Sequence, residues 1–175
     1  MGGFLTFRDI LDARKGSTRI LILGDYSENL AYKGLRGACL DTLKRLQSHL
    51  WREGFSETRL VVDFMDEEGV PEESYDEHFL KKSEYYIRHW AEILLFVLLQ
   101  EGNNQSVVRE WSYMIKVCPD KCRNAIIMSN RNVRIGALLR GDIKGHRITN
   151  DTFTDASALF RGARKLCFNK LYNLI

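Results

Sequence analysis

The stretch Ala91-Glu-Ile-Leu-Leu-Phe-Val-Leu-Leu99 is the most apolar segment of the chain and decides its fold class. Apolar and polar residues do not alternate in it, so a strand formed here would bury both of its faces. Strands of this kind lie in the middle of parallel sheets that carry helices on both sides. The run is also far shorter than the ~20 residues that a membrane-spanning helix needs.

On both sides of this segment, aliphatic runs alternate with amphipathic stretches. The pattern predicts strands at residues 18–24, 58–64, 91–99, 124–129 and 147–153, separated by helices near residues 35–50, 74–90, 106–118 and 135–139 and followed by one at 155–175. Strict alternation of strands and helices indicates an α/β fold with three layers and a doubly wound sheet. Five mainly parallel strands in a chain of this length fit the flavodoxin-like order 2-1-3-4-5.

Length and composition indicate one globular unit. The chain has 175 residues, 45% of them hydrophobic, and only 2 prolines. We therefore expect a single domain over residues 1–175, in which residues 18–175 form the core. Apolar residues at helical spacing predict an additional helix at residues 4–14, within an N-terminal extension of residues 1–17 that packs on the domain or on a partner.

Net charge, the first residues and the cysteines argue against several classes of protein. A formal net charge of +3 is too small to indicate a nucleic-acid partner. The first residues contain no apolar run of signal-peptide length, so we expect a cytoplasmic protein with no membrane association. Four cysteines are then expected as free thiols. Cys118 and Cys122 have no second pair of ligands close in sequence, and we expect no metal site.

The predicted topology also places a binding site. In doubly wound sheets, ligands bind beyond the carboxyl ends of the strands, at the point where strand order reverses. Here that point lies between the first and third strands, where residues 25–34 and 100–106 form polar loops. The candidate substrate-binding residues are Asp25, Tyr26, Asn29 and Lys33 in the first loop, Asn103 and Ser106 in the second, and Arg131 after the fourth strand.

Each of these residue types has a chemical reason to bind a nucleotide or nucleoside. Tyr26 has a ring that stacks on a base, Asn29 and Lys33 have groups that hold hydroxyls or phosphate, and Arg131 is suited to phosphate. Asparagine, aspartate, glycine and serine also form ordinary turns, so a plain loop is the alternative. Neither loop has a Gly-x-Gly-x-x-Gly fingerprint or a Walker A sequence, which disfavours a standard Rossmann dehydrogenase and a P-loop NTPase.

Glu110 is the candidate catalytic residue. It falls four residues after Ser106 on the same face of the predicted helix and borders the apolar stripe that contains Val107 and Met114. A fixed carboxylate there suits cleavage of an N-glycosidic bond, because it can stabilise or attack an oxocarbenium-like centre. We expect the helix amino end to favour the ionised form. The alternative is an acid that merely complements the helix dipole.

The segment Ser106-Val-Val-Arg-Glu110-Trp-Ser-Tyr, together with the apolar strand and short polar loop before it, resembles nucleoside 2-deoxyribosyltransferase-like and TIR-like domains. These families have a flavodoxin-like fold and a catalytic glutamate early in the helix after the third strand. The resemblance implies that role for Glu110 and a position near the ribose for Ser106. The residues 103–106 differ from the Asp-rich loop with Gly-Thr of the deoxyribosyltransferases, which favours the TIR-like side or a divergent relative.

We therefore expect a domain that binds a nucleotide or nucleoside and cleaves or transfers an N-glycosidic bond, with NAD as one candidate substrate and no bound cofactor. The alternative is a non-catalytic module that senses a nucleotide in the same cleft or uses its helix faces for homo-oligomerisation. A third reading, a CheY-like regulatory domain, needs an acidic pair after the first strand, where only Asp25 is found.

Overall fold

We analysed a computed structural model, which describes residues 6–26, 36–65, 75–100, 102 and 104–174. In this part of the chain the strands are β1 (Ile20–Leu23), β2 (Thr58–Leu60), β3 (Ile93–Leu98), β4 (Ala125–Asn130) and β5 (Thr149–Phe153). The α-helices are α1 (Phe7–Ser17), α2 (Arg36–Arg52), α3 (Tyr75–His89), α4 (Gln105–Val117), α5 (Ala137–Gly145) and α6 (Ala156–Tyr172). Two 3₁₀ helices, η1 (Val61–Phe64) and η3 (Pro119–Asn124), precede α3 and β4.

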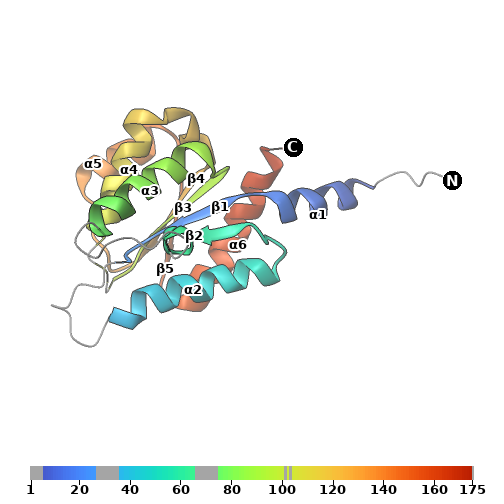
Figure 1. The fold of residues 1–175 in the computed structure, drawn as a ribbon, viewed down its shortest axis with the longest axis horizontal. Coiled ribbons are helices and arrows are strands. Elements are labelled where there is room, and N and C mark those ends of the chain that lie inside the picture. Colours follow the sequence, from blue (N-terminus) through green and yellow to red (C-terminus); the bar gives the residue numbers. More distant parts are fainter. Residues whose placement is uncertain (1–5, 27–35, 66–74, 101, 103, 175) are drawn as a thin grey trace.

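The sheet has the predicted order. Its strands follow one another as β2-β1-β3-β4-β5, and every neighbouring pair is parallel. Helices α3, α4 and α5 lie on one side of the sheet and α2 and α6 on the other, which gives three layers (Figure 1). The flavodoxin-like architecture predicted from the sequence is therefore confirmed.

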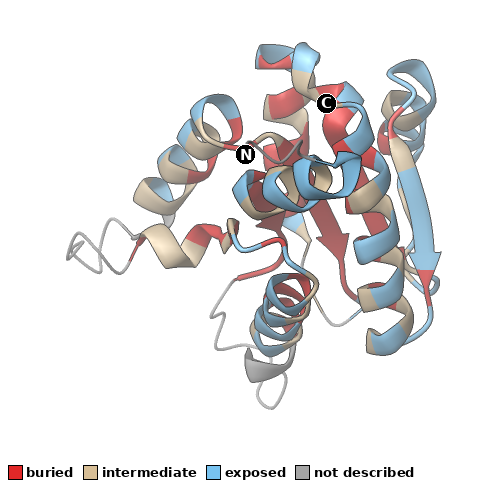
Figure 2. Cartoon of the chain, turned by 90° about the vertical axis from the view of Figure 1, so that its right-hand side faces the viewer, coloured by how far each residue is buried: buried red, intermediate tan, exposed pale blue. Residues whose placement is uncertain are grey.

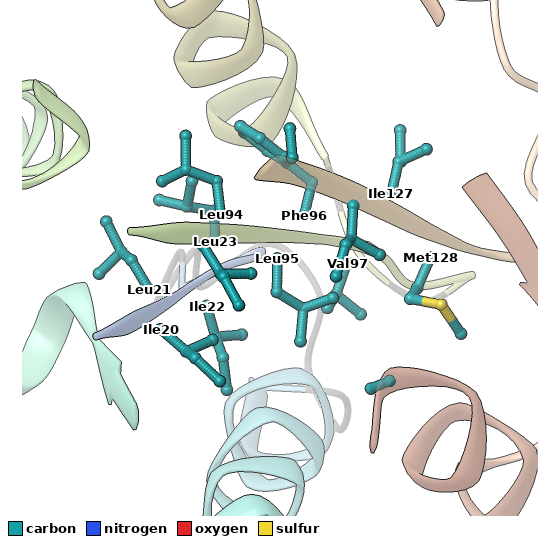
Figure 3. Packing of buried hydrophobic residues seen from close by; sticks show 14 of the residues in the cluster. Ile20, Leu21, Ile22, Leu23, Leu94, Leu95, Phe96, Val97, Ile127 and Met128 are labelled. Carbon is teal, nitrogen blue, oxygen red and sulfur yellow. The ribbon is translucent and has the colours of Figure 1, made fainter. Parts of the chain in front are cut away.

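The two central strands form the middle of the core. Every residue of β1 and β3 is buried, and their side chains point alternately toward the helices above and below the sheet (Figure 3). On the α4 side, the Phe96 ring meets the Trp111 indole edge-on, with ring centroids 5.1 Å apart. On the α2 side, a methyl group at Gly24 would lie 2.5 Å from Leu43 Cδ1, so glycine lets α2 approach the end of β1.

The helix α1 contacts the sheet near its carboxyl end. A capping box starts it, because Thr6 Oγ1 accepts a hydrogen bond from the Asp9 N–H and the Thr6 N–H donates to Asp9 Oδ2. Near its end, Arg14 Nη2 donates to Glu92 Oε1 at 2.6 Å. The amino-terminal half runs outward from the body of the domain (Figure 1). The helix covers Phe7–Ser17, whereas we predicted residues 4–14, of which 4 and 5 lie outside the described residues.

Two predicted elements differ from the structure. The strand predicted at residues 58–64 ends at Leu60, and Val61–Phe64 form η1. Asp63 Oδ2 accepts hydrogen bonds from the Leu60 N–H at 2.8 Å and from Gln47 Nε2 on α2 at 2.5 Å, which turns the chain away from the sheet. The short helix predicted at residues 135–139 is α5, which begins later and extends to Gly145.

The sheet ends in an exposed edge. In β5, Asn150, Asp151 and Thr152 are all exposed, and this strand stands at the right of Figure 2. The central strands behind it are buried. Among the helices of the described residues, none has the length and apolar character needed to cross a membrane.

Candidate functional site

Asp25, which follows β1, lies beside Gly102, which follows β3. A methyl group at Gly102 would come within 3.1 Å of both Cβ and Oδ2 of Asp25, so only glycine fits here without displacing the aspartate. Asp25 is 6% exposed and therefore belongs to the floor of this junction. This contact brings Asp25 and Gly102 together at the carboxyl edge of the sheet, as the strand order predicts. Residues 27–34, 101 and 103 of the two predicted loops lie outside the described residues.

Asn104 holds the second loop in shape. Its backbone has φ 51°, in the left-handed region, which asparagine tolerates better than most residues. The side-chain Nδ2 donates to the carbonyl oxygens of Leu99 at 2.8 Å and Gly102 at 3.1 Å, and Oδ1 accepts from the Leu99 N–H at 3.2 Å. This residue, absent from the predicted site, is the N-cap position of α4 and has a structural role.

Glu110 is fully buried on the α3 side of α4. Its exposed fraction is 0%, and neither carboxyl oxygen has a hydrogen-bond partner in the described part of the chain. The Ser83 hydroxyl of α3 is near the carboxyl group, but it donates to the carbonyl oxygen of Leu80 at 2.9 Å. A buried polar group without a partner is rare in folded proteins and costs free energy.

Burial raises the pKa of the Glu110 carboxyl to about 8. The Ser83 hydroxyl, which can turn from the Leu80 carbonyl oxygen to donate to the ionised carboxylate, opposes this rise, and the negative charge of Glu84 adds to it. Desolvation favours the uncharged form of an acid, and here it outweighs the attraction of a helix amino end for an anion. The expectation that the helix keeps Glu110 ionised is therefore wrong for the protein without ligand. Near neutral pH the carboxyl is mostly protonated, so it can both donate and accept a hydrogen bond.

Tyr26 is close enough for the charge of Glu110 to act on it, but its surroundings differ from the expected role. The ring is 9% exposed and packs against Phe79 of α3, with centroids 5.3 Å apart. Its hydroxyl donates to the carbonyl oxygen of Ile22. Burial and then the charge of Glu110 raise the pKa of Tyr26 well above its usual range. A ring enclosed in this way is a wall of the site and offers no free face for stacking on a base.

The remaining predicted residues are only partly brought together. Ser106 is half-buried in the first turn of α4, two residues after the N-cap. Arg131 is exposed after β4, and its backbone N–H donates to the carbonyl oxygen of Phe153 at 2.9 Å, which places it toward the β5 side of the sheet. The predicted ligands Asn29, Lys33 and Asn103 lie outside the described residues.

A groove on the opposite face of α4 was not predicted. It has a volume of about 180 Å³ and lies between α4 and α5 at the carboxyl end of β3. Its wall residues include Leu98, Val108, Trp111, Leu138 and Leu139, with Arg134 at the loop before α5. We call it the α4–α5 groove. For this region the sequence predicted only a short helix at residues 135–139.

Metal-ligand geometry is not found within the described ranges, where no group of three or more histidine, cysteine, aspartate or glutamate side chains converges. All four cysteines are buried free thiols, as predicted.

No protein-family model matches the chain, and no curated protein matches it in sequence.

Proposed function

We propose that the chain binds a nucleoside or nucleotide at the carboxyl edge between β1 and β3, and that Glu110 acts on its N-glycosidic bond. One observation carries the proposal, namely that both oxygens of a fully buried carboxyl group have no hydrogen-bond partner within the described residues. The fold does not need an acid at this position, because an apolar side chain would pack there at lower cost. A ligand hydroxyl would supply the missing partner.

The chemistry follows from the surroundings of Glu110. The side chains that shift its pKa within the described part of the chain are Ser83 and Glu84, and neither of them is a cation. An oxocarbenium-like centre that develops beside the carboxyl would be stabilised by its ionised form. The low polarity that disfavours the free anion strengthens this interaction once positive charge is present.

A binding role without chemistry is the second candidate, and the protonated state of Glu110 favours it. A neutral carboxyl is a good hydrogen-bond partner for a ribose hydroxyl but a poor nucleophile. The two candidates share the site and differ in whether the base is released. The resemblance to deoxyribosyltransferase-like and TIR-like domains supports the first.

The test is to incubate the purified protein with NAD and a panel of nucleosides and nucleotides, and to follow free base by chromatography. For the catalytic proposal we expect base release that is lost in Glu110→Gln and retained in the matched control Glu77→Gln, which changes an exposed glutamate of α3. Ligand-induced thermal stabilisation without base release supports the binding candidate. Neither release nor stabilisation with any compound contradicts both.

The pH dependence of kcat/KM tests separately whether Glu110 acts in its ionised form. The profile of kcat/KM reports ionisations of the free enzyme. Because the pKa of Glu110 is raised to about 8, we expect kcat/KM to rise with pH and to level off above about pH 8. A profile that falls through the same range would assign Glu110 the role of proton donor instead.

A further inference from the structure

The amino-terminal half of α1 presents two apolar side chains to solvent. Phe7 is 61% exposed and Ile10 is 44% exposed, and their spacing of three places them on one side of the helix. The other half is anchored, because Leu11 packs against the core and Arg14 pairs with Glu92. A helix that is held at one end and exposes apolar residues at the other is suited to enter a groove on a partner.

The α4–α5 groove has the size and lining for such side chains. Its volume of about 180 Å³ is below the roughly 300–1,000 Å³ typical of small-molecule sites and fits one or two apolar side chains. Val108 and Leu138, which line it, are 45% and 77% exposed. Deeper in, Trp111 Nε1 donates to Asp142 Oδ2 at 3.2 Å, so that acid is already engaged.

The charges of the two surfaces are complementary. Arg134 lines the groove, is exposed, and forms no ion pair within the described residues. Next to it, Gly136 caps α5 without a side-chain hydrogen bond, so the helix amino end adds partial positive charge. On α1, Asp9 adjoins Ile10, and hydrogen bonds from Thr6 hold the pKa of its carboxyl below the usual range. The same end of α1 also carries Arg8, which pairs with Asp12 at 3.9 Å. Residues 7–12 therefore have one negative charge in excess, with Asp9 beside the apolar Ile10.

We propose that the exposed end of α1 in one copy of this chain docks into the α4–α5 groove of a second copy. The helix cannot reach the groove of its own chain. It leads directly into the amino end of β1, whereas the groove opens at Leu98, the last residue of β3, across the parallel sheet (Figure 1). The two surfaces differ, so the contact is head to tail, and the rotation between copies decides whether it closes into a ring or continues as an open filament.

Sedimentation velocity of the full chain over a wide concentration range tests the association. We expect the average mass to rise with concentration, and Phe7→Ser and Leu138→Ser each to weaken the association by at least about tenfold, as expected for central apolar anchors. The control Tyr172→Ser removes an exposed apolar residue of α6 and leaves the association unchanged. Both positions are exposed, so thermal unfolding of the variants should match the original chain.

Mixing the two variants gives the decisive result. The Phe7→Ser chain retains a groove and the Leu138→Ser chain retains a helix, so together they form a one-to-one dimer that cannot grow further. Arg134→Glu is expected to weaken the association and to reduce its sensitivity to salt. A chain that stays monomeric at all concentrations would overturn the proposal. So would a mixture that forms no dimer, or association that depends on Phe7 but not on Leu138, which is the result expected if two α1 helices pair with each other.

Discussion

Two glutamates at opposite ends of the same strand have opposite environments. Glu92 comes directly before β3, where its Oε1 accepts from Arg14 at 2.6 Å and its Oε2 from the Arg19 N–H at 3.1 Å. These hydrogen bonds and the charges of the two arginines lower the pKa of Glu92 despite partial burial. Glu110 follows β3 in α4, has no hydrogen-bond partner within the described residues, and has a raised pKa.

The difference between the two glutamates indicates that one edge of the sheet serves the stability of the fold and the other is available for a ligand. At the amino edge, the carboxylate of Glu92 joins α1 to the start of β1 and is fully used by the protein itself. At the carboxyl edge, where ligands bind in parallel α/β sheets, no described residue uses the hydrogen-bonding capacity of the Glu110 carboxyl. A group that weakens the fold and sits at the edge where ligands bind is the stronger candidate for function.

The largest expected effect is on the pH dependence of stability. The pKa of Glu110 in the folded protein, about 8, lies above the value of about 4.3 for an unfolded glutamate. The folded state therefore retains the proton longer, and its stability falls as pH rises between these values. We expect Glu110→Gln to remove this decline, so that variant and original chain diverge by on the order of 5 kcal/mol from pH 4 to pH 8.

Urea unfolding of both chains at a series of pH values measures this divergence. Glu110→Leu, which removes the polar group as well, serves as a second variant and should show the same pH dependence as Glu110→Gln. Parallel stability curves for the original chain and both variants would show that Glu110 titrates normally and that the contrast with Glu92 is wrong.

Asn104 lies at the same carboxyl edge as Glu110, but its side-chain atoms form hydrogen bonds within the protein. We expect Asn104→Ala to lower the unfolding free energy by about 2–3 kcal/mol, because alanine is strained in the left-handed region and the three side-chain hydrogen bonds are lost. Asn104→Gly is the matched control, since glycine adopts φ 51° freely and loses only the hydrogen bonds. Equal stability of the two variants would show that backbone strain has no part in the effect.

The contribution of Glu92 to stability should change with pH in the opposite direction to that of Glu110. Because its pKa is lowered by folding, Glu92 stabilises the folded state at pH values above the pKa of an unfolded glutamate. This stabilisation is lost as the pH falls through the lower pKa of the folded state. We expect Glu92→Gln to destabilise the chain by about 1 kcal/mol at pH 7, because the pairs with Arg14 and Arg19 are partly exposed. The loss should shrink in acid. A loss that grows toward low pH would contradict the assignment.

The fold was predictable because its central strands are apolar on both faces, which is typical of strands in the middle of a parallel sheet. The predicted strand order also implies that Asp25, after β1, lies close to Gly102, after β3, and the structure agrees. The end of β2 was not predictable, because Val61 and Val62 favour a strand and the hydrogen bonds of Asp63 that turn the chain come from Leu60 and from Gln47 on another element.

The environment of each site residue was harder to predict than its position. Glu110 was correctly placed early in the helix after β3, but its burial depends on how α3 packs against α4, which spacing along α4 does not reveal. Tyr26 was expected to face a ligand, and a sequence does not distinguish a ring that stacks on a base from one that packs on Phe79. The structural role of Asn104 depends on a left-handed backbone angle, which the polarity of its side chain does not indicate.

The smallest expected effect concerns the two α3 residues that adjust Glu110. The Ser83 hydroxyl lowers the pKa of Glu110 and the charge of Glu84 raises it. We therefore expect Ser83→Ala to raise this pKa further and Glu84→Gln to lower it, as measured by following the carboxyl carbon of Glu110 by NMR during a pH titration. Desolvation is the first cause of the raised pKa, so in both variants it should stay above that of Glu92. If Glu84→Gln returned Glu110 to the ordinary range of glutamate, repulsion between neighbouring acids would explain the raised pKa, and Glu110 would no longer be distinguished by its burial.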